Sequence, residues 1–135
     1  MIFADTGYFI GLIDPNDGLH RRALAWSHRV NEPILVTEYV AWETMNHFAK
    51  RSRRSRAGEL IRRVMGDRTG YEFMAATPDL FDLGLQMYER TRDQTWSLTD
   101  CISIGLMTRR RMDRALAFDH HFIQAGFQAL LRLDP

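Results

Sequence analysis

The sequence predicts an α/β fold in which a central parallel sheet of four to five strands carries helices on both faces. Short apolar runs alternate with longer segments of helical periodicity along the chain, as in sheets built from strand–helix–strand units. The runs show little polar alternation, which is typical of strands buried on both faces. No repeat, low-complexity tract or Pro/Gly/Ser linker interrupts the 135 residues, so we expect one domain over residues 1–135.

Each expected strand is a short run of mainly apolar or β-branched residues bounded by polar or turn residues. The expected strands are Ile2–Ala4, Ile34–Val36, Tyr71–Ala75, Ala115–Phe118 and, at the end of the chain, Gln128–Leu133. Two of them, the first and the fourth, are followed directly by an aspartate: Asp5 and Asp119.

Helices are expected where apolar residues recur at helical spacing and where a capping residue stands at the start. The expected helical segments are Thr6–Ile13, Leu19–Val30, the segment from the cap Thr37 to Lys50, Arg56–Met65, Asp79–Arg92 after the Thr77–Pro78 cap, Ser97–Arg110, and a short helix ending at Ala125. Between the first two helices, residues 14–18 form a strong turn signal.

The composition is that of a globular protein, with 45% hydrophobic and 26% charged residues. No apolar run approaches the roughly 18 residues that a membrane helix requires, and the N-terminus lacks a secretory signal. The single cysteine, Cys101, cannot form an internal disulfide, which fits a reducing compartment. We therefore expect a cytoplasmic protein without membrane contact.

Arginine dominates the basic residues: only Lys50 of the 18 is lysine. Seven basic residues fall between Lys50 and Arg63 and are opposed there only by Glu59, and a second group lies within residues 109–114. The planar guanidinium binds phosphate well, so these segments are candidates for holding a nucleic-acid backbone. A solvated helix face or an interface with an acidic partner explains either cluster equally well.

Four acidic residues far apart in the chain fall near predicted strand ends or in early turns of helices: Asp5, Glu43, Asp100 and Asp119. A parallel sheet brings the carboxyl ends of its strands to one edge, where ligands bind. Carboxylates gathered there repel one another unless a cation joins them, and Mg²⁺ or Mn²⁺ prefers such oxygen ligands. The usual substrate for such a metal is a phosphate ester.

Each acid also has a purely structural explanation. Asp5 is suited to a helix N-terminus, Glu43 to a surface ion pair, and Asp100 to a capping box with Ser97. Only the shared position of the four favours a site.

Competing chemistries fit the sequence less well. No glycine-rich phosphate loop precedes a helix, and no late lysine accompanies the acids as in receiver domains. Cys101 lacks the setting of a nucleophile. His120 and His121 point about 100° apart if helical, so packing or surface roles are expected rather than a shared zinc ion.

At these residues the chain resembles the PIN-domain family, in particular its small VapC-type toxins. The resemblance spans nearly the whole chain, and the order and spacing of its short motifs make it fairly specific. The matching segments are Phe3 to Thr6, Thr37 to Glu43, Ser97 to Ser103, and Ala117 to Phe122 continuing into Ala125 to Phe127.

The resemblance implies a PIN-like three-layer α/β/α fold and a metal-dependent endoribonuclease that uses Mg²⁺ or Mn²⁺. Asp5, Glu43, Asp100 and Asp119 match the four acidic positions of the family. Its implied metal ligands are the three aspartates, with Glu43 acting directly or through water. An RNA substrate, a cognate antitoxin and homodimerisation are also implied.

Secondary roles near this site are expected for Thr6, Asn46 and Ser97. The arginines expected to contact RNA phosphates are Arg51, Arg53 and Arg54. The chain departs from the family pattern at Ala117, where a hydroxyl residue is common, and at Gly7, where a larger residue is frequent, which leaves the positioning of water open.

Two alternatives stay open on the sequence. One is a housekeeping PIN-type nuclease that processes RNA. The other is a catalytically silent module that binds RNA or protein, in which the acids only cap helices.

Overall fold

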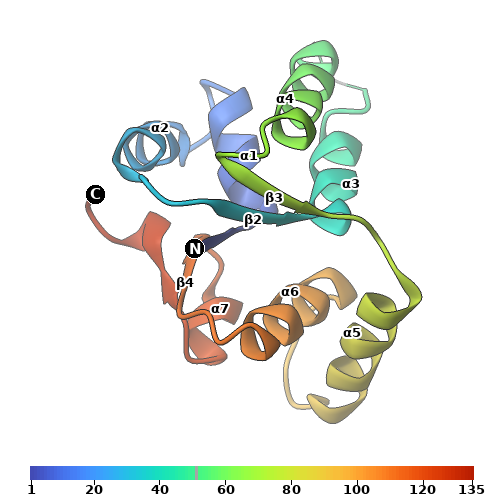
Figure 1. Cartoon of the computed structure of the whole chain (residues 1–135). Helices are drawn as coiled ribbons and strands as arrows, with labels where there is room; N and C mark the ends of the chain where they lie inside the picture. The colour runs from blue at the N-terminus through green and yellow to red at the C-terminus, as the bar shows by residue number, and fades with distance from the viewer. Residues whose placement is uncertain (51) are drawn as a thin grey trace.

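The computed structural model describes residues 1–50 and 52–135, which form a parallel sheet between two layers of helices (Figure 1). The strands are β1 (Ile2–Ala4), β2 (Ile34–Thr37), β3 (Tyr71–Met74), β4 (Arg114–Leu116) and β5 (Gln128–Ala129). The helices are α1 (Thr6–Ile13), α2 (His20–Arg29), α3 (Glu38–His47), α4 (Arg54–Gly66), α5 (Pro78–Arg90), α6 (Leu98–Arg109) and α7 (His120–Gln124), followed by a 3₁₀ turn, η1 (Leu130–Arg132). The predicted α/β/α class with a parallel sheet of four to five strands is confirmed, and the sheet has five.

The strand order is β3-β2-β1-β4-β5, with every neighbouring pair parallel. The chain fills the sheet outward from β1 in one direction and then returns to fill the other side, so the order reverses between β1 and β4. A reversal of this kind opens a crevice at the carboxyl ends of the two strands, where α/β proteins bind ligands. Phe3 of β1 pairs with Leu35 of β2 and with Ala115 of β4.

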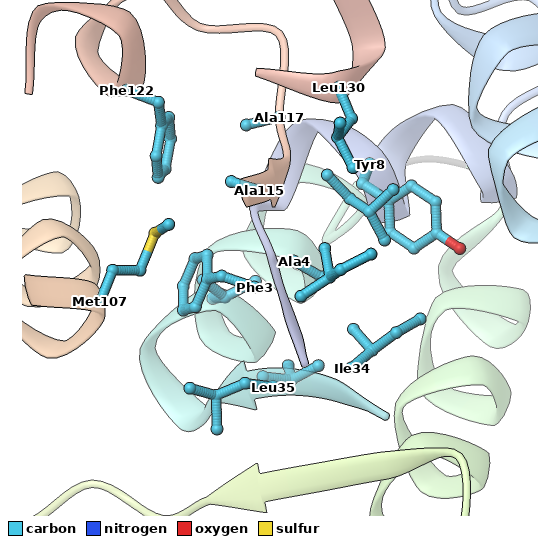
Figure 2. Packing of buried hydrophobic residues seen from close by; sticks show 14 of the residues in the cluster. Phe3, Ala4, Tyr8, Ile34, Leu35, Met107, Ala115, Ala117, Phe122 and Leu130 are labelled. Carbon is cyan, nitrogen blue, oxygen red and sulfur yellow. The ribbon is translucent and has the colours of Figure 1, made fainter. Parts of the chain in front are cut away.

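Helices α1 to α4 cover one face of the sheet and α5 to α7 cover the other (Figure 1). Because successive residues of a strand point to opposite faces, β1 contributes to both layers of core. Phe3 lies near Phe122, with ring centroids 6.2 Å apart, and near Met107 of α6 (Figure 2). Tyr8 of α1, by contrast, lies on the side of Leu130 in the same view. The central strands are thus buried on both sides, as their apolar runs predict.

Helices α5 and α6 approach closely because glycines face the neighbouring helix. A Cβ added at Gly84 would lie 2.2 Å from Cγ1 and 3.2 Å from Cα of Ile102, and one at Gly105 would lie 3.0 Å from Cγ of Leu83. Residues 101–107 of α6 are all buried. This packing holds the N-terminal end of α6 in a defined place.

Three predicted capping residues are confirmed. The Thr37 hydroxyl accepts from the backbone N–H of Val40, and the Thr77 hydroxyl accepts from that of Leu80. Ser97 forms a capping box with Asp100.

Two predicted boundaries on the α4 side of the sheet are wrong. Helix α3 ends at His47, three residues before Lys50, because the chain turns to bury Phe48 against Ile13 and Ala57. Helix α4 begins at Arg54 rather than Arg56.

The last predicted strand is also mostly wrong, since β5 ends at Ala129 and continues into η1. Ala129, Leu130 and Leu131 are all buried. A regular strand would turn the middle residue away from its neighbours. None of the helices in the described part of the chain is long and apolar enough to cross a membrane.

Candidate active site at the carboxyl edge of the sheet

The four predicted acids line one pocket, of about 490 Å³, at the point where the strand order reverses. Asp5 follows β1, Glu43 lies in α3, Asp100 lies in the first turn of α6, and Asp119 caps α7. Four separate elements therefore deliver one carboxylate each. Thr6 also lines this pocket, whereas Asn46 and Ser97 do not.

Asp5 occupies the most buried position of the four, with 8% of its surface exposed. Its backbone N–H donates to the carbonyl of Leu116 at 3.2 Å, which ties it to β4. Its pKa is raised from 3.8 to about 7, mainly by burial. The negative charges of Asp100, Glu43 and Asp119 add to this shift, and the backbone N–H of Thr6 opposes it.

Asp100 is held by its own helix start. Its Oδ2 accepts from the backbone N–H of Ser97 at 2.9 Å, and the Ser97 hydroxyl accepts from the backbone N–H of Asp100 at 3.1 Å. Ser97 thus acts on the pocket only by orienting Asp100. Capping and pocket lining coexist in the same carboxylate, since each of its oxygens can accept more than one hydrogen bond.

His121 joins two of the acids, a contact that the sequence pattern did not predict. Its Nδ1 lies 2.9 Å from Oδ2 of Asp100 and 3.2 Å from Oδ1 of Asp119. The available signal was its place two residues after Asp119, in the first turn of a helix that the acid caps. His120 instead lines the pocket from an exposed position.

The predicted RNA-binding arginines lie away from this pocket. Arg53 places Nε 3.6 Å from Oδ1 of Asp14, and Arg54 donates from Nη1 to the carbonyl of Ala49 at 2.6 Å. Neither side chain lines the acidic pocket. Arg51 lies outside the described residues.

A different arginine, Arg132, lines the acidic pocket together with Phe118. The guanidinium carbon lies 4.3 Å from the centroid of the Phe118 ring, and Nε donates to the Phe118 carbonyl at 2.5 Å. The predicted strand ending at Leu133 already placed Arg132 near the carboxyl edge of the sheet. A single arginine at a strand end is a weak signal beside the arginine clusters of this chain.

The residues of the pocket suit a hard divalent cation. Their negatively charged groups are all carboxylates, and the hydroxyl of the buried Thr6 has no hydrogen-bond partner among the described residues. No three His, Cys, Asp or Glu side chains in the described part are grouped tightly enough to hold an ion as they stand. This spacing of the carboxylates is compatible with Mg²⁺, because Mg²⁺ usually keeps several waters and binds through one or two carboxylates together with substrate phosphates.

Comparison with known proteins agrees with this architecture. No curated protein sequence gives a significant match to the chain. Among solved structures, the crystal structure of VapC20 of Mycobacterium tuberculosis, described as a sarcin-ricin loop cleaving toxin, superposes with a TM-score of 0.84. It is 22% identical, and the match covers 96% of this chain and 98% of that one, which establishes a common fold. The family model described as PIN domain matches residues 2–128, and the chain therefore belongs to the PIN domain family.

Proposed function

We propose that this protein is a VapC-type toxin: a metal-dependent endoribonuclease that hydrolyses RNA phosphodiester bonds with Mg²⁺ or Mn²⁺. The observation that carries the proposal is the pocket lined by Asp5, Glu43, Asp100 and Asp119 at the strand-order reversal. The toxin described for VapC20, which shares the fold, supports RNA as the substrate class.

Asp5, Asp100 and Asp119 are the residues proposed to hold the metal, with Glu43 contacting it directly or through water. When bound, the ion supplies a water of lowered pKa and neutralises charge on the phosphate oxygens. Burial of Asp5 keeps its carboxylate poorly solvated and therefore strongly attracted to a cation. The capping box fixes Asp100, and Nδ1 of His121 lies 2.9 Å from Asp100 and 3.2 Å from Asp119.

The direct test compares purified wild type with Asp5→Asn and Asp100→Asn on a single-stranded RNA of mixed sequence, with Mg²⁺, Mn²⁺ or EDTA. We expect cleavage by wild type only when a divalent ion is present. Both variants should stay folded, as judged by circular dichroism, and lose cleavage. Cleavage that survives in EDTA, or in Asp5→Asn at the wild-type rate, contradicts the proposal.

A nuclease of this type requires an inhibitor, and we propose a cognate antitoxin protein as a partner. A second pocket of about 320 Å³ between α1 and α4 combines apolar residues such as Leu12 and Leu60 with Arg56, Arg63 and a single acid, Glu59. Such a surface suits an acidic, partly apolar protein segment.

Expression of the chain alone should arrest growth, and co-expression of the gene beside it should relieve the arrest. Growth arrest by Asp5→Asn at equal expression would show that the arrest does not come from RNA cleavage.

We also propose a homodimer in the cytoplasm. Large apolar side chains are exposed on α3 and α5: Trp42, Met45, Phe81 and Tyr88. Light scattering after gel filtration should give twice the 15.8 kDa of the chain. Replacing Trp42, which is 54% exposed, with Glu should shift the protein towards the monomer. An unchanged mass for Trp42→Glu assigns the contact to another surface.

A further inference from the structure

We propose that Arg132, held in place by Phe118, is a phosphate-binding subsite of the acidic pocket that grips the RNA backbone next to the bond being cut. The inference rests on the proposed function, because it names how that same pocket holds its substrate. Arg132 is the residue that contacts substrate, and Phe118 is a positioning residue.

The C-terminal segment brings Arg132 to the pocket through backbone pairing. Strand β5 pairs with β4 through Arg114 with Gln128 and Ala115 with Ala129. Beyond the ladder, the backbone N–H of Leu131 donates to the carbonyl of Ala117 at 3.1 Å. The next residue therefore stands level with Phe118, one position before Asp119. These backbone pairings fix the position of the Arg132 main chain beside the pocket, so its side chain does not have to extend from a distant segment.

Charge in the pocket is unbalanced in a way that Arg132 partly offsets. Among the described residues that line the pocket, four are carboxylates and Arg132 is the one with a permanent positive charge. RNA approaching the pocket meets repulsion from the acids, which a metal ion relieves only near its own position. The flanking phosphate needs a separate cation, and Arg132 supplies it.

The guanidinium is preorganised for this role. The Phe118 ring lies beneath it at 4.3 Å, and the Phe118 carbonyl accepts from Nε. In the described part of the chain, Nη1 and Nη2 have no hydrogen-bond partner and Arg132 forms no ion pair, so two donor groups remain for a phosphate. A planar guanidinium that is already oriented loses less freedom for each hydrogen bond that it forms.

The arginine-rich segment offers a contrast. Arg53 is near Asp14, and Arg54 donates to the carbonyl of Ala49. Neither lines the acidic pocket. Of these three arginines, only Arg132 is placed to contact an RNA backbone bound in the acidic pocket.

The test measures cleavage kinetics for Arg132→Gln, Arg132→Lys, Phe118→Leu and Phe118→Tyr on a fluorescein-labelled single-stranded RNA with Mg²⁺. Gln keeps an N–H donor without the charge, and Lys keeps the charge without the planar fork. Arg68→Ala is the control, since Arg68 is an exposed residue that precedes β3, at the opposite edge of the sheet. RNA affinity is measured with every variant in the Asp5→Asn background, so that the probe is not consumed.

A lost charge-assisted hydrogen bond should raise KM or Kd about 10-fold to 100-fold for Arg132→Gln, with kcat within about 3-fold. The slope of log affinity against log salt should become shallower by about 0.7 for Arg132→Gln and stay unchanged for Arg132→Lys. Phe118→Leu should raise KM by a few-fold at an unchanged salt slope, and Phe118→Tyr should restore the wild-type value because it retains the ring face.

The inference is overturned if Arg132→Gln binds RNA with wild-type affinity and salt slope, or if it weakens binding no more than Arg68→Ala. It is also overturned if kcat falls while Kd and KM stay constant. If wild type cleaves RNA but the Arg132 variants do so equally well, this inference alone fails. If wild type does not cleave RNA under any divalent ion, the proposed function fails first.

Discussion

The acidic pocket and the arginine-rich helix α4 are both highly charged, and they are built in opposite ways. The acids come from four elements that are distant in sequence and meet at one point. The arginines of α4 are neighbours in sequence, and Arg54, Arg56, Arg62 and Arg63 are all exposed. The buried residues of the same helix are Ala57, Ile61 and Val64, at helical spacing.

This difference in construction distinguishes a candidate ligand site, the acidic pocket, from a solvated surface, the outer face of α4. Burying a carboxylate beside three others costs free energy, as the pKa of Asp5 shows: it is raised mainly by burial and further by the neighbouring charges. Such a cost is typical of sites where a ligand offsets it. Arginines on the outer face of an amphipathic helix cost little, because water solvates them. We therefore expect substitutions in the pocket to have large effects on RNA cleavage and substitutions on α4 to have small ones.

The largest effect is expected for Asp5→Asn in the cleavage assay. Loss of a proposed metal ligand should remove several kcal/mol of transition-state stabilisation, so the rate should fall by about three orders of magnitude. Isothermal titration with Mn²⁺ should show weaker binding in the same variant. A loss of cleavage with undiminished Mn²⁺ binding would remove Asp5 from the set of ligands.

A pH dependence of stability should follow from Asp5 in the metal-free protein. The folded state raises the pKa of this carboxyl from 3.8 to about 7, so the folded state holds the proton more tightly than the unfolded chain. The stabilising contribution is present below pH 4 and is lost as the pH rises towards 7. The upper limit of the loss is on the order of 4 kcal/mol.

Urea denaturation in EDTA from pH 4.5 to 8.5 measures this dependence. Asp5→Asn lacks the titrating group, so its stability should fall less over the same interval. Addition of Mg²⁺ should recover stability in wild type at pH 8, because binding to the folded state alone stabilises it. Parallel curves for the two proteins would show that Asp5 is not the titrating residue.

Alanine substitutions at two glycines compare the packing of the helix pair that carries Asp100 with the packing of α4. Gly84→Ala in α5 should destabilise the protein by about 1–3 kcal/mol, because the new methyl collides with Ile102 of the helix that carries Asp100. Gly58→Ala in α4 meets no atom within 4 Å and should stabilise by about 0.5–1 kcal/mol through helix propensity. Urea midpoints of both variants measure this. Equal shifts would mean that the two regions are packed alike.

The smallest effect is expected for Arg62→Gln on the exposed face of α4. Stability should change by less than about 0.5 kcal/mol, and KM for RNA should change by less than about 2-fold. The matched variant is Arg132→Gln. If Arg62→Gln raises KM as much as Arg132→Gln does, α4 is part of the RNA-binding surface and the distinction between the two regions is lost.

Much of the candidate site could be anticipated where local signals were sufficient. An apolar run that ends on a carboxylate predicted the places of Asp5 and Asp119, although β4 itself stops at Leu116. The Ser97 and Asp100 pattern predicted a capping box, which is present. These signals succeed because strand burial and helix capping depend on residues within a few positions of one another.

The positions of Glu43, His121 and Arg132 depended on the whole chain. Glu43 reaches the pocket only because α3 packs with that face towards the carboxyl edge, and His121 meets Asp100 only because α6 and α7 adjoin there. For Arg132 the deciding contact is the hydrogen bond from Leu131 to Ala117.

Local patterns in the chain predict the succession of strands and helices along it, the caps, and the acids that follow β1 and begin α6. Which of the remaining charged residues face those acids depends on how distant segments pack. Periodicity and capping act within one or two turns of chain, whereas the pocket is formed by contacts between segments dozens of residues apart. Such contacts are chosen by the packing of the whole core, which no local pattern encodes.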